Sequence, residues 1–237
     1  MTDRLGNFLG LPSEINNVKL YSPTIDSIGK IGEVKYNVYL TLASFNKESI
    51  LKNIFGVSDE NYLSIKNENS FDVLTSIPTV VNATKEAISF FSKCEIDFDH
   101  ISSSYISSGS PIITKENYCE FSKIIKRLNG INEEDASIKY KNEKTKMLHE
   151  KLLKLRAKYK KNENESLDLK DLLSILCNAD GNGINIFNVG NLTIYQVYEH
   201  FERLNIKEQH TRLLKVWANG YLGKDDKLPE WIIKSKL

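Results

Sequence analysis

A run of oxygen-bearing residues has the spacing with which a calcium-binding loop begins. Asn178, Asp180 and Asn182 occupy the places of the first, third and fifth ligands of an EF-hand loop. Gly183 follows, where that loop turns sharply, but the twelfth position is Val189 instead of a bidentate glutamate. Without that carboxylate the loop has too few strong ligands, so we interpret the run as a turn that ends a helix. We expect no metal ion and no cofactor.

A second group of candidates is acidic. Glu95, Asp97 and Asp99 alternate along one predicted strand face, followed by His100. Paired carboxylates hold Mg²⁺ beside phosphate in metal-dependent nucleases. However, no lysine follows at a spacing that would complete such a site, and the sequence has no second acidic cluster. We interpret the group as a solvated strand face whose charge prevents edge-to-edge aggregation.

The remaining reactive residue types form no recognisable catalytic pattern. The histidines have no Cys or His at zinc spacing, and we expect surface or structural roles for His100, His149, His200 and His210. Three widely separated cysteines fit free thiols in a reducing compartment better than a disulfide framework. There is no GxSxG, P-loop or GxGxxG motif. We therefore expect that the protein is not an enzyme.

The elements that would position such residues are mostly helical. The chain is 41% hydrophobic and 27% charged, which are globular values, and its apolar residues recur mainly at helical spacing. Alternation at 94–99 and a return through 101–113 predict a small β-hairpin inserted among helices. We predict a mainly α fold with three parts: a helical domain with the hairpin near 94–113, a long basic helix with its linker, and a second helical domain, covering 1–130, 131–165 and 166–237.

Several residues predict where helices begin and end. Thr193, with Gln196 three residues later, forms a T-x-x-Q capping box at the start of a strongly aromatic helix. Ser22 and Thr114 are expected to be N-caps of two earlier helices. Residues 228–233 are expected to form a short terminal helix.

The segment 139–161 is unusually basic. It carries ten Lys or Arg residues and two Glu, so the rest of the chain is left with −7 of a total charge of +1. A narrow apolar seam runs along it at helical spacing, which is typical of a helix that lies along another helix. The seam consists of Leu148, Leu152, Leu155 and Tyr159. We favour a solvated helix that packs on an acidic surface over a helix that contacts phosphates.

Two stretches resemble a known family. YSPTIDSIGKIGEVKYNVYL, from Tyr21, and NGINIFNVGNLTIYQVYEHFERL, from Asn182, followed by a Trp-containing tail, are similar to tail assembly chaperones of phages and prophages of low-GC Gram-positive bacteria. The resemblance implies a non-enzymatic bacteriophage protein that binds the helical tape-measure protein during virion assembly. The residues that we expect to bind such a partner are Ile194, Tyr195, Tyr198, Phe201 and Trp217 and the seam Leu148, Leu152, Leu155 and Tyr159.

Two alternatives remain open. The chain could be a structural tail or baseplate component of the phage particle, or a nucleic-acid-binding protein that uses 139–161. We expect a protein partner, with a homo-oligomer left open, and we do not expect nucleic acid or a membrane. No segment has the length of a membrane span or the pattern of a signal peptide. The expected location is the host cytoplasm, or the phage particle under the structural alternative.

Overall fold

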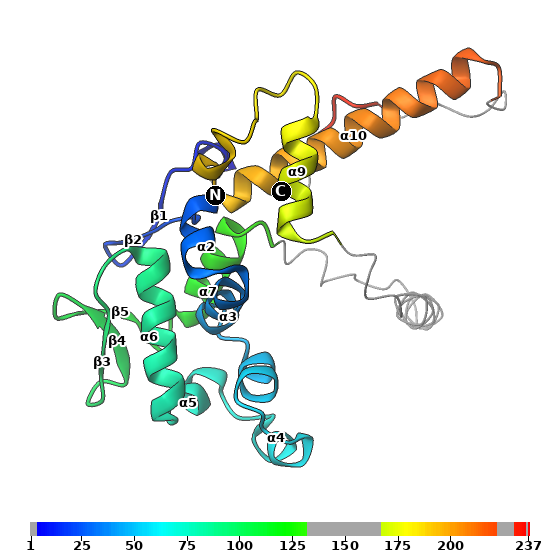
Figure 1. Ribbon diagram of the computed structural model, residues 1–237. Helices are drawn as coiled ribbons and strands as arrows, with labels where there is room; N and C mark the ends of the chain where they lie inside the picture. Colours follow the sequence, from blue (N-terminus) through cyan, green and yellow to red (C-terminus); the bar gives the residue numbers. More distant parts are fainter. Residues whose placement is uncertain (1–3, 132–166, 222–229, 236) are drawn as a thin grey trace.

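The computed structural model describes residues 4–131, 167–221, 230–235 and 237. The fold is mainly α with small antiparallel sheets, as predicted (Figure 1). The elements of the first part are α1 Arg4–Phe8, β1 Ser13–Ile15, β2 Val18–Leu20, α2 Ile25–Ile31, α3 Glu33–Ala43, η1 Ser49–Ile54, α4 Asp59–Ile65, α5 Ser70–Thr75, α6 Pro78–Ser92, β3 Asp97–Asp99, β4 Ser104–Ser107, β5 Ser110–Ile113 and α7 Tyr118–Leu128. After 132–166 follow α9 Leu169–Asn178, η3 Val189–Asn191 and α10 Ile194–Ala218.

The core lies where α3 packs against α6 and α7. Gly32, with a φ of 85°, separates α2 from α3, so the chain bends at this glycine between the two helices. The largest enclosed side chains are aromatic, and Phe45 lies within about 6 Å of the rings of Phe71, Tyr105 and Phe121. Aromatic rings bury a large apolar area per residue, so this cluster is a main source of the body's stability.

The β structure is more extensive than a single hairpin. β1 and β2 form a hairpin with a two-residue turn, and both turn residues, Asn16 and Asn17, have left-handed backbone angles. β3, β4 and β5 form a three-stranded meander in which the run 101–113 contributes two strands instead of the one predicted. The second turn falls at Ser108 and Gly109, where both residues have positive φ.

Two predicted N-caps are displaced along the chain. Thr24, not Ser22, caps α2, and its Oγ1 accepts a hydrogen bond from the Ser27 amide at 3.2 Å. Asn117 occupies the N-cap position of α7 instead of Thr114, whose Oγ1 bonds within the preceding turn. The described part of the predicted terminal helix, 230–233, contains bends and no helix.

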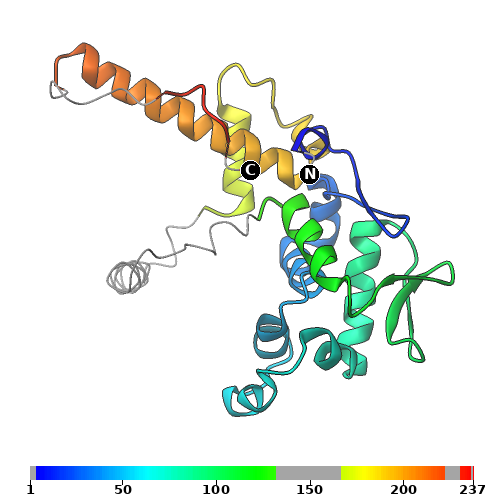
Figure 2. The same cartoon turned by 180° about the vertical axis from the view of Figure 1, so that it is seen from behind.

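The capping box at Thr193 is confirmed. Thr193 Oγ1 accepts from the Gln196 amide at 3.2 Å, and Gln196 Oε1 accepts from the Thr193 amide at 2.9 Å. The helix that it opens, α10, is a single helix of 25 residues. Its first turns pack on α1, α7 and α9, and its second half projects from the body (Figures 1 and 2). We call residues 205–218 of α10 the arm.

The beginning of α10 joins the helices of the first part of the chain to the region of α9. Ile194 belongs to the main core, together with residues of α2, α3 and α7. A smaller core beside it, made of Leu176, Ile184, Val189 and Val197, joins α9, the loop before η3 and α10. The division predicted at residue 166 therefore lies between segments whose side chains meet in one core.

Candidate partner-binding surface

The structure divides the predicted binding residues by exposure. Ile194 and Tyr195 are 0% and 3% exposed, so both side chains belong to the protein's own core. Tyr198 and Phe201 are half-buried against the two cores, and Trp217 is 55% exposed. The seam residues Leu148, Leu152, Leu155 and Tyr159 lie outside the described residues.

Contacts from α7 and α1 explain why the first turns of α10 are covered. The ring of Tyr198 lies against Gly130, where an added Cβ would come within 2.7 Å of Tyr198 Cδ2. Tyr195 lies deeper, and burial raises the pKa of its hydroxyl, an effect that the charges of Arg4 and Arg127 partly oppose. This end of α10 is therefore a structural joint, and the exposed surface begins further along the helix.

The arm carries the exposed apolar side chains of α10. Ile206, Leu213 and Trp217, with His210 between them, follow at spacings of four, three and four residues, which places them on one helix face. On this face Ile206 and His210 are half-buried, and Leu213 and Trp217 are the exposed apolar side chains. Leu213, Leu214, Val216 and Trp217 are all at least one-third exposed. α10 is continuous from Ile194 to Ala218, so the apolar residues at 213–217 lie on the same helix as Ile206.

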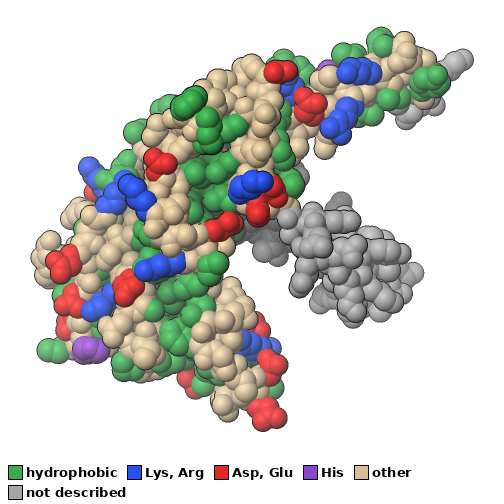
Figure 3. All heavy atoms as spheres, viewed as in Figure 1, with side chains coloured by type: hydrophobic (Ala, Val, Ile, Leu, Met, Phe, Trp, Pro, Cys, Tyr) green, Lys and Arg blue, Asp and Glu red, His purple; other side chains and the backbone are tan. Residues whose placement is uncertain are grey.

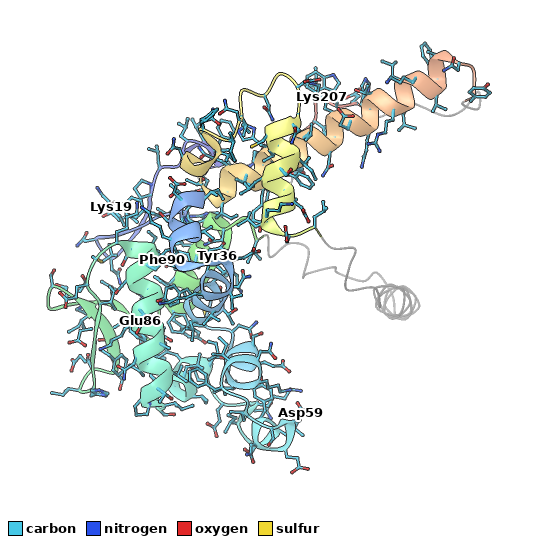
Figure 4. The ribbon with its side chains drawn as sticks, in the orientation of Figure 1. Lys19, Tyr36, Asp59, Glu86, Phe90 and Lys207 are labelled. Carbon is cyan, nitrogen blue, oxygen red and sulfur yellow. The ribbon has the colours of Figure 1, made fainter. Side chains whose placement is uncertain are left out.

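The charges on the arm are mainly positive. Lys207, Arg212 and Lys215 lie on it beside the single acid Glu208. Figure 3 shows basic and apolar side chains together along the arm, and Figure 4 shows Lys207 on the middle of α10. A partner for this surface would combine apolar side chains with acidic ones.

The C-terminal residues return to the base of α10. Arg203 donates to the carbonyl oxygen of Ile233, and Arg4 Nε donates to that of Leu237 at 2.8 Å. Arg4 Nη2 also donates to Ser235 Oγ at 2.7 Å, and Ser235 is buried. Residues from both ends of the chain thus hold the base of α10, while Trp231 and Ile232 remain exposed.

The carboxylates of the acidic strand accept hydrogen bonds from neighbouring side chains. Asp97 accepts a hydrogen bond from Lys85 at 3.0 Å, which holds the pKa of that carboxyl below its usual value. Asp99 Oδ2 accepts from Ser102 Oγ at 2.6 Å, and this bond lowers the pKa of Asp99. These carboxylates thus brace the strand and the turn that follows it.

The turn after α9 uses its polar groups locally. Asn182 donates to the Leu176 carbonyl at 2.8 Å and accepts from the Ile184 amide at 2.8 Å. Asn178 donates to Ser174 in the last turn of α9. Among the residues that the structure describes, no group of three or more His, Cys, Asp or Glu is arranged to hold a metal ion.

The comparisons with known proteins concern the region of α9 and α10. Residues 160–236 match a family model described as the YomV second domain, a phage-associated family name. The match spans the C-terminal third of the chain and includes the arm. Comparison with curated proteins and with solved structures gives no match. Within the described ranges, no helix is long and apolar enough to cross a membrane.

Proposed function

We propose that the protein is a non-enzymatic phage tail assembly chaperone-like protein that binds a helical segment of the tape-measure protein. The observation that carries the proposal is the arm, a projecting stretch of α10 with apolar side chains exposed on it. The region matched by the phage-associated model includes this arm. Residue resemblance to tail assembly chaperones supplies the identity of the partner.

The physical basis of binding is helix-to-helix packing. Apolar residues that recur every three or four positions are the pattern with which one amphipathic helix packs along another. Leu213 and Trp217 lie on that face of the arm, and Trp is among the residues that contribute most at interfaces. Lys207, Arg212 and Lys215 beside the face favour a partner helix with acidic flanks.

The test compares two double variants of the full chain. Leu213→Ser with Trp217→Ser removes the apolar face of the arm, and Val34→Ser with Leu63→Ser removes two exposed apolar side chains of α3 and α4 as a matched control. The tape-measure protein encoded in the same gene cluster is co-expressed with each, and the complex is quantified by size exclusion and calorimetry. We expect the arm variant to bind at least about a hundredfold more weakly, a loss of about 2.7 kcal/mol, with the control unchanged.

Equal binding by the arm variant would overturn the arm as the contact surface. Mass spectrometry of purified particles separates the chaperone from a structural component, since a chaperone leaves before the particle is complete. A stoichiometric amount of the protein in mature particles would replace the chaperone proposal with the structural one.

A further inference from the structure

A cleft on the opposite side of the body from the α3–α6 face lies between α1, β1 and α7. It has a volume of about 470 Å³, within the range of ligand-binding pockets. Figure 2 shows this side, with α7 in green and the β1–β2 hairpin in blue. Its apolar wall is formed by Leu11, Pro12 and Ile124, and its polar wall includes Asn7 and Arg127.

Two buried donors in this cleft have no acceptor among the described residues. Asn7 is 3% exposed, and its Nδ2 makes no hydrogen bond. Arg127 Nε is buried and unpaired as well, although Arg127 Nη2 donates to Ser13 Oγ at 3.3 Å. Buried donors almost always have a partner, because an unmade hydrogen bond lowers stability. Asn7 and Arg127 both line the cleft, so a group that enters it can supply the acceptor oxygens that these two donors lack.

The strand beside the cleft has a free edge. Within the part of the chain that the structure describes, β1 pairs with β2 alone, through Ser13–Leu20, Glu14–Lys19 and Ile15–Val18. In a hairpin with a two-residue turn the residues next to the turn exchange backbone hydrogen bonds, and the next pair does not. The N–H and C=O of Glu14 therefore point away from β2, and Glu14 lines the cleft.

The charges of the lining select the kind of ligand. Glu14 and Glu120 offset Lys123 and Arg127, so the cleft has no net charge that would concentrate a free anion. A peptide backbone is neutral, carries both acceptors and donors, and can place side chains on the apolar wall. The edge of β1 offers a donor and an acceptor at the same spacing that a further strand would use.

We infer that the cleft binds an extended segment of a partner polypeptide. The segment lies along the edge of β1 and pairs with the backbone of Glu14. Carbonyl oxygens of the same segment accept hydrogen bonds from Asn7 Nδ2 and Arg127 Nε, and an apolar side chain contacts Leu11 and Ile124. The inference does not rest on the arm, because the two surfaces share no residue.

The test uses a displayed library of random 12-residue peptides, selected on the full chain. Selected peptides are synthesised and titrated against the wild type and three variants. Asn7→Leu keeps the shape of the side chain and removes its donor, and Glu14→Pro removes the edge N–H. Asn53→Leu is the control, since Asn53 is an exposed residue of η1 outside the cleft.

We expect peptides with micromolar dissociation constants whose affinity falls about tenfold or more in Asn7→Leu and in Glu14→Pro. The free Asn7→Leu protein should melt about 2–4 °C higher than the wild type, since an unpaired buried donor is gone. This combination separates a ligand-binding amide from a structural one, whose loss would lower the melting temperature. Asn53→Leu should change neither quantity.

Three results would overturn the inference. The first is that the library yields no peptide that binds, and the second is that selected peptides bind wild type and Asn7→Leu equally. The third is that millimolar acetate displaces the peptides completely, which would assign the donors to a carboxylate alone. Because the arm variant retains the cleft, it should bind the selected peptides with unchanged affinity.

Discussion

Thr24 and Thr193 face each other as an antiparallel pair, and each caps the helix that begins at the next residue. The Ile25 amide donates to the Leu192 carbonyl and the Ile194 amide donates to the Pro23 carbonyl, both at 2.9 Å. Two helix starts that are far apart in the chain thus satisfy each other's first backbone donors. Thr24 lies in the stretch quoted above from Tyr21 and Thr193 in the stretch quoted from Asn182, so the pair gives those two stretches a shared structural role.

Removing a cap at this junction should destabilise the whole described body. Thr193→Ala removes the acceptor of the Gln196 amide, and the expected decrease in the free energy of unfolding is about 1 kcal/mol. Thr193→Ser retains the acceptor and serves as the control. Both are measured by urea denaturation with a common slope. Indistinguishable midpoints for the alanine and serine variants would show that the Thr193 cap does not stabilise the fold.

How far the sequence could predict this junction depends on the range of each contact. The Thr193 cap was predictable because Gln196 is three residues away and the motif is local. The error at Ser22 arose from a distant contact, since its Oγ accepts from the Tyr195 amide, 173 residues along the chain. The spacing of apolar residues predicts Tyr195 as a partner-binding residue, because that spacing is the same on a buried helix face and on an exposed one. Only the distant contacts show that Tyr195 is buried.

A buried pair between α3 and α7 gives a second prediction. Tyr36 donates to Asn129 Oδ1 at 2.9 Å, and both residues are buried. Tyr36→Phe leaves that oxygen without its donor, so we expect a loss of about 1–3 kcal/mol at neutral pH, measured by chemical denaturation. Thr41→Val removes a hydroxyl that donates to the Asn37 carbonyl on the exposed side of α3, where water can replace it. This variant should lower the free energy of unfolding by less.

The same tyrosine makes the protein sensitive to alkali. Burial raises the pKa of Tyr36 above its ordinary value near 10. A raised pKa means that the stability of the neutral form is complete below the unfolded value and is lost as the pH rises above it. The wild type should therefore lose stability above about pH 10 more steeply than Tyr36→Phe. Parallel curves for the two proteins between pH 9 and about pH 11 would contradict this.

Another prediction concerns the glycine beneath Tyr198. Gly130 has a φ of 71°, and a Cβ there would meet the Tyr198 ring at 2.7 Å. Gly56 has a similar φ of 67° with nothing within 4 Å, so Gly56→Ala measures the backbone strain alone. We expect about 1–2 kcal/mol of destabilisation for Gly56→Ala and about 1–3 kcal/mol more for Gly130→Ala. Equal losses for the two variants would mean that the ring moves aside without cost.

The loss of stability at low pH gives a further prediction. The hydrogen bond from Lys85 lowers the pKa of Asp97, and the bond from Ser102 lowers that of Asp99. A depressed pKa means that the stability these carboxylates contribute is complete above the unfolded value near 4 and is lost as the pH falls through the folded value. Asp97→Asn should therefore flatten the decline of stability below about pH 4. Exposed Asp180→Asn, for which no ion pair is formed among the described residues, is the control.

The last prediction separates a calcium loop from a structural turn after α9. Asn182 uses its amide nitrogen on Leu176 and its amide oxygen on the Ile184 amide, so the oxygen that an EF-hand would offer to calcium is already bonded. Asn182→Ala removes both bonds and should lower stability by about 1–2 kcal/mol whether calcium is present or absent. For comparison, a ligand at a hundred times its Kd would add about 2.7 kcal/mol to the free energy of unfolding.

Thermal unfolding of the wild type, Asn182→Ala and Asp180→Ala is followed with millimolar calcium and with a chelator. We expect identical curves for each protein under the two conditions. Position 189 is a valine, so the bidentate carboxylate that would complete the coordination of calcium is absent from this position. A calcium-dependent rise in the melting temperature that Asp180→Ala abolishes would show instead that the loop rearranges to bind the ion.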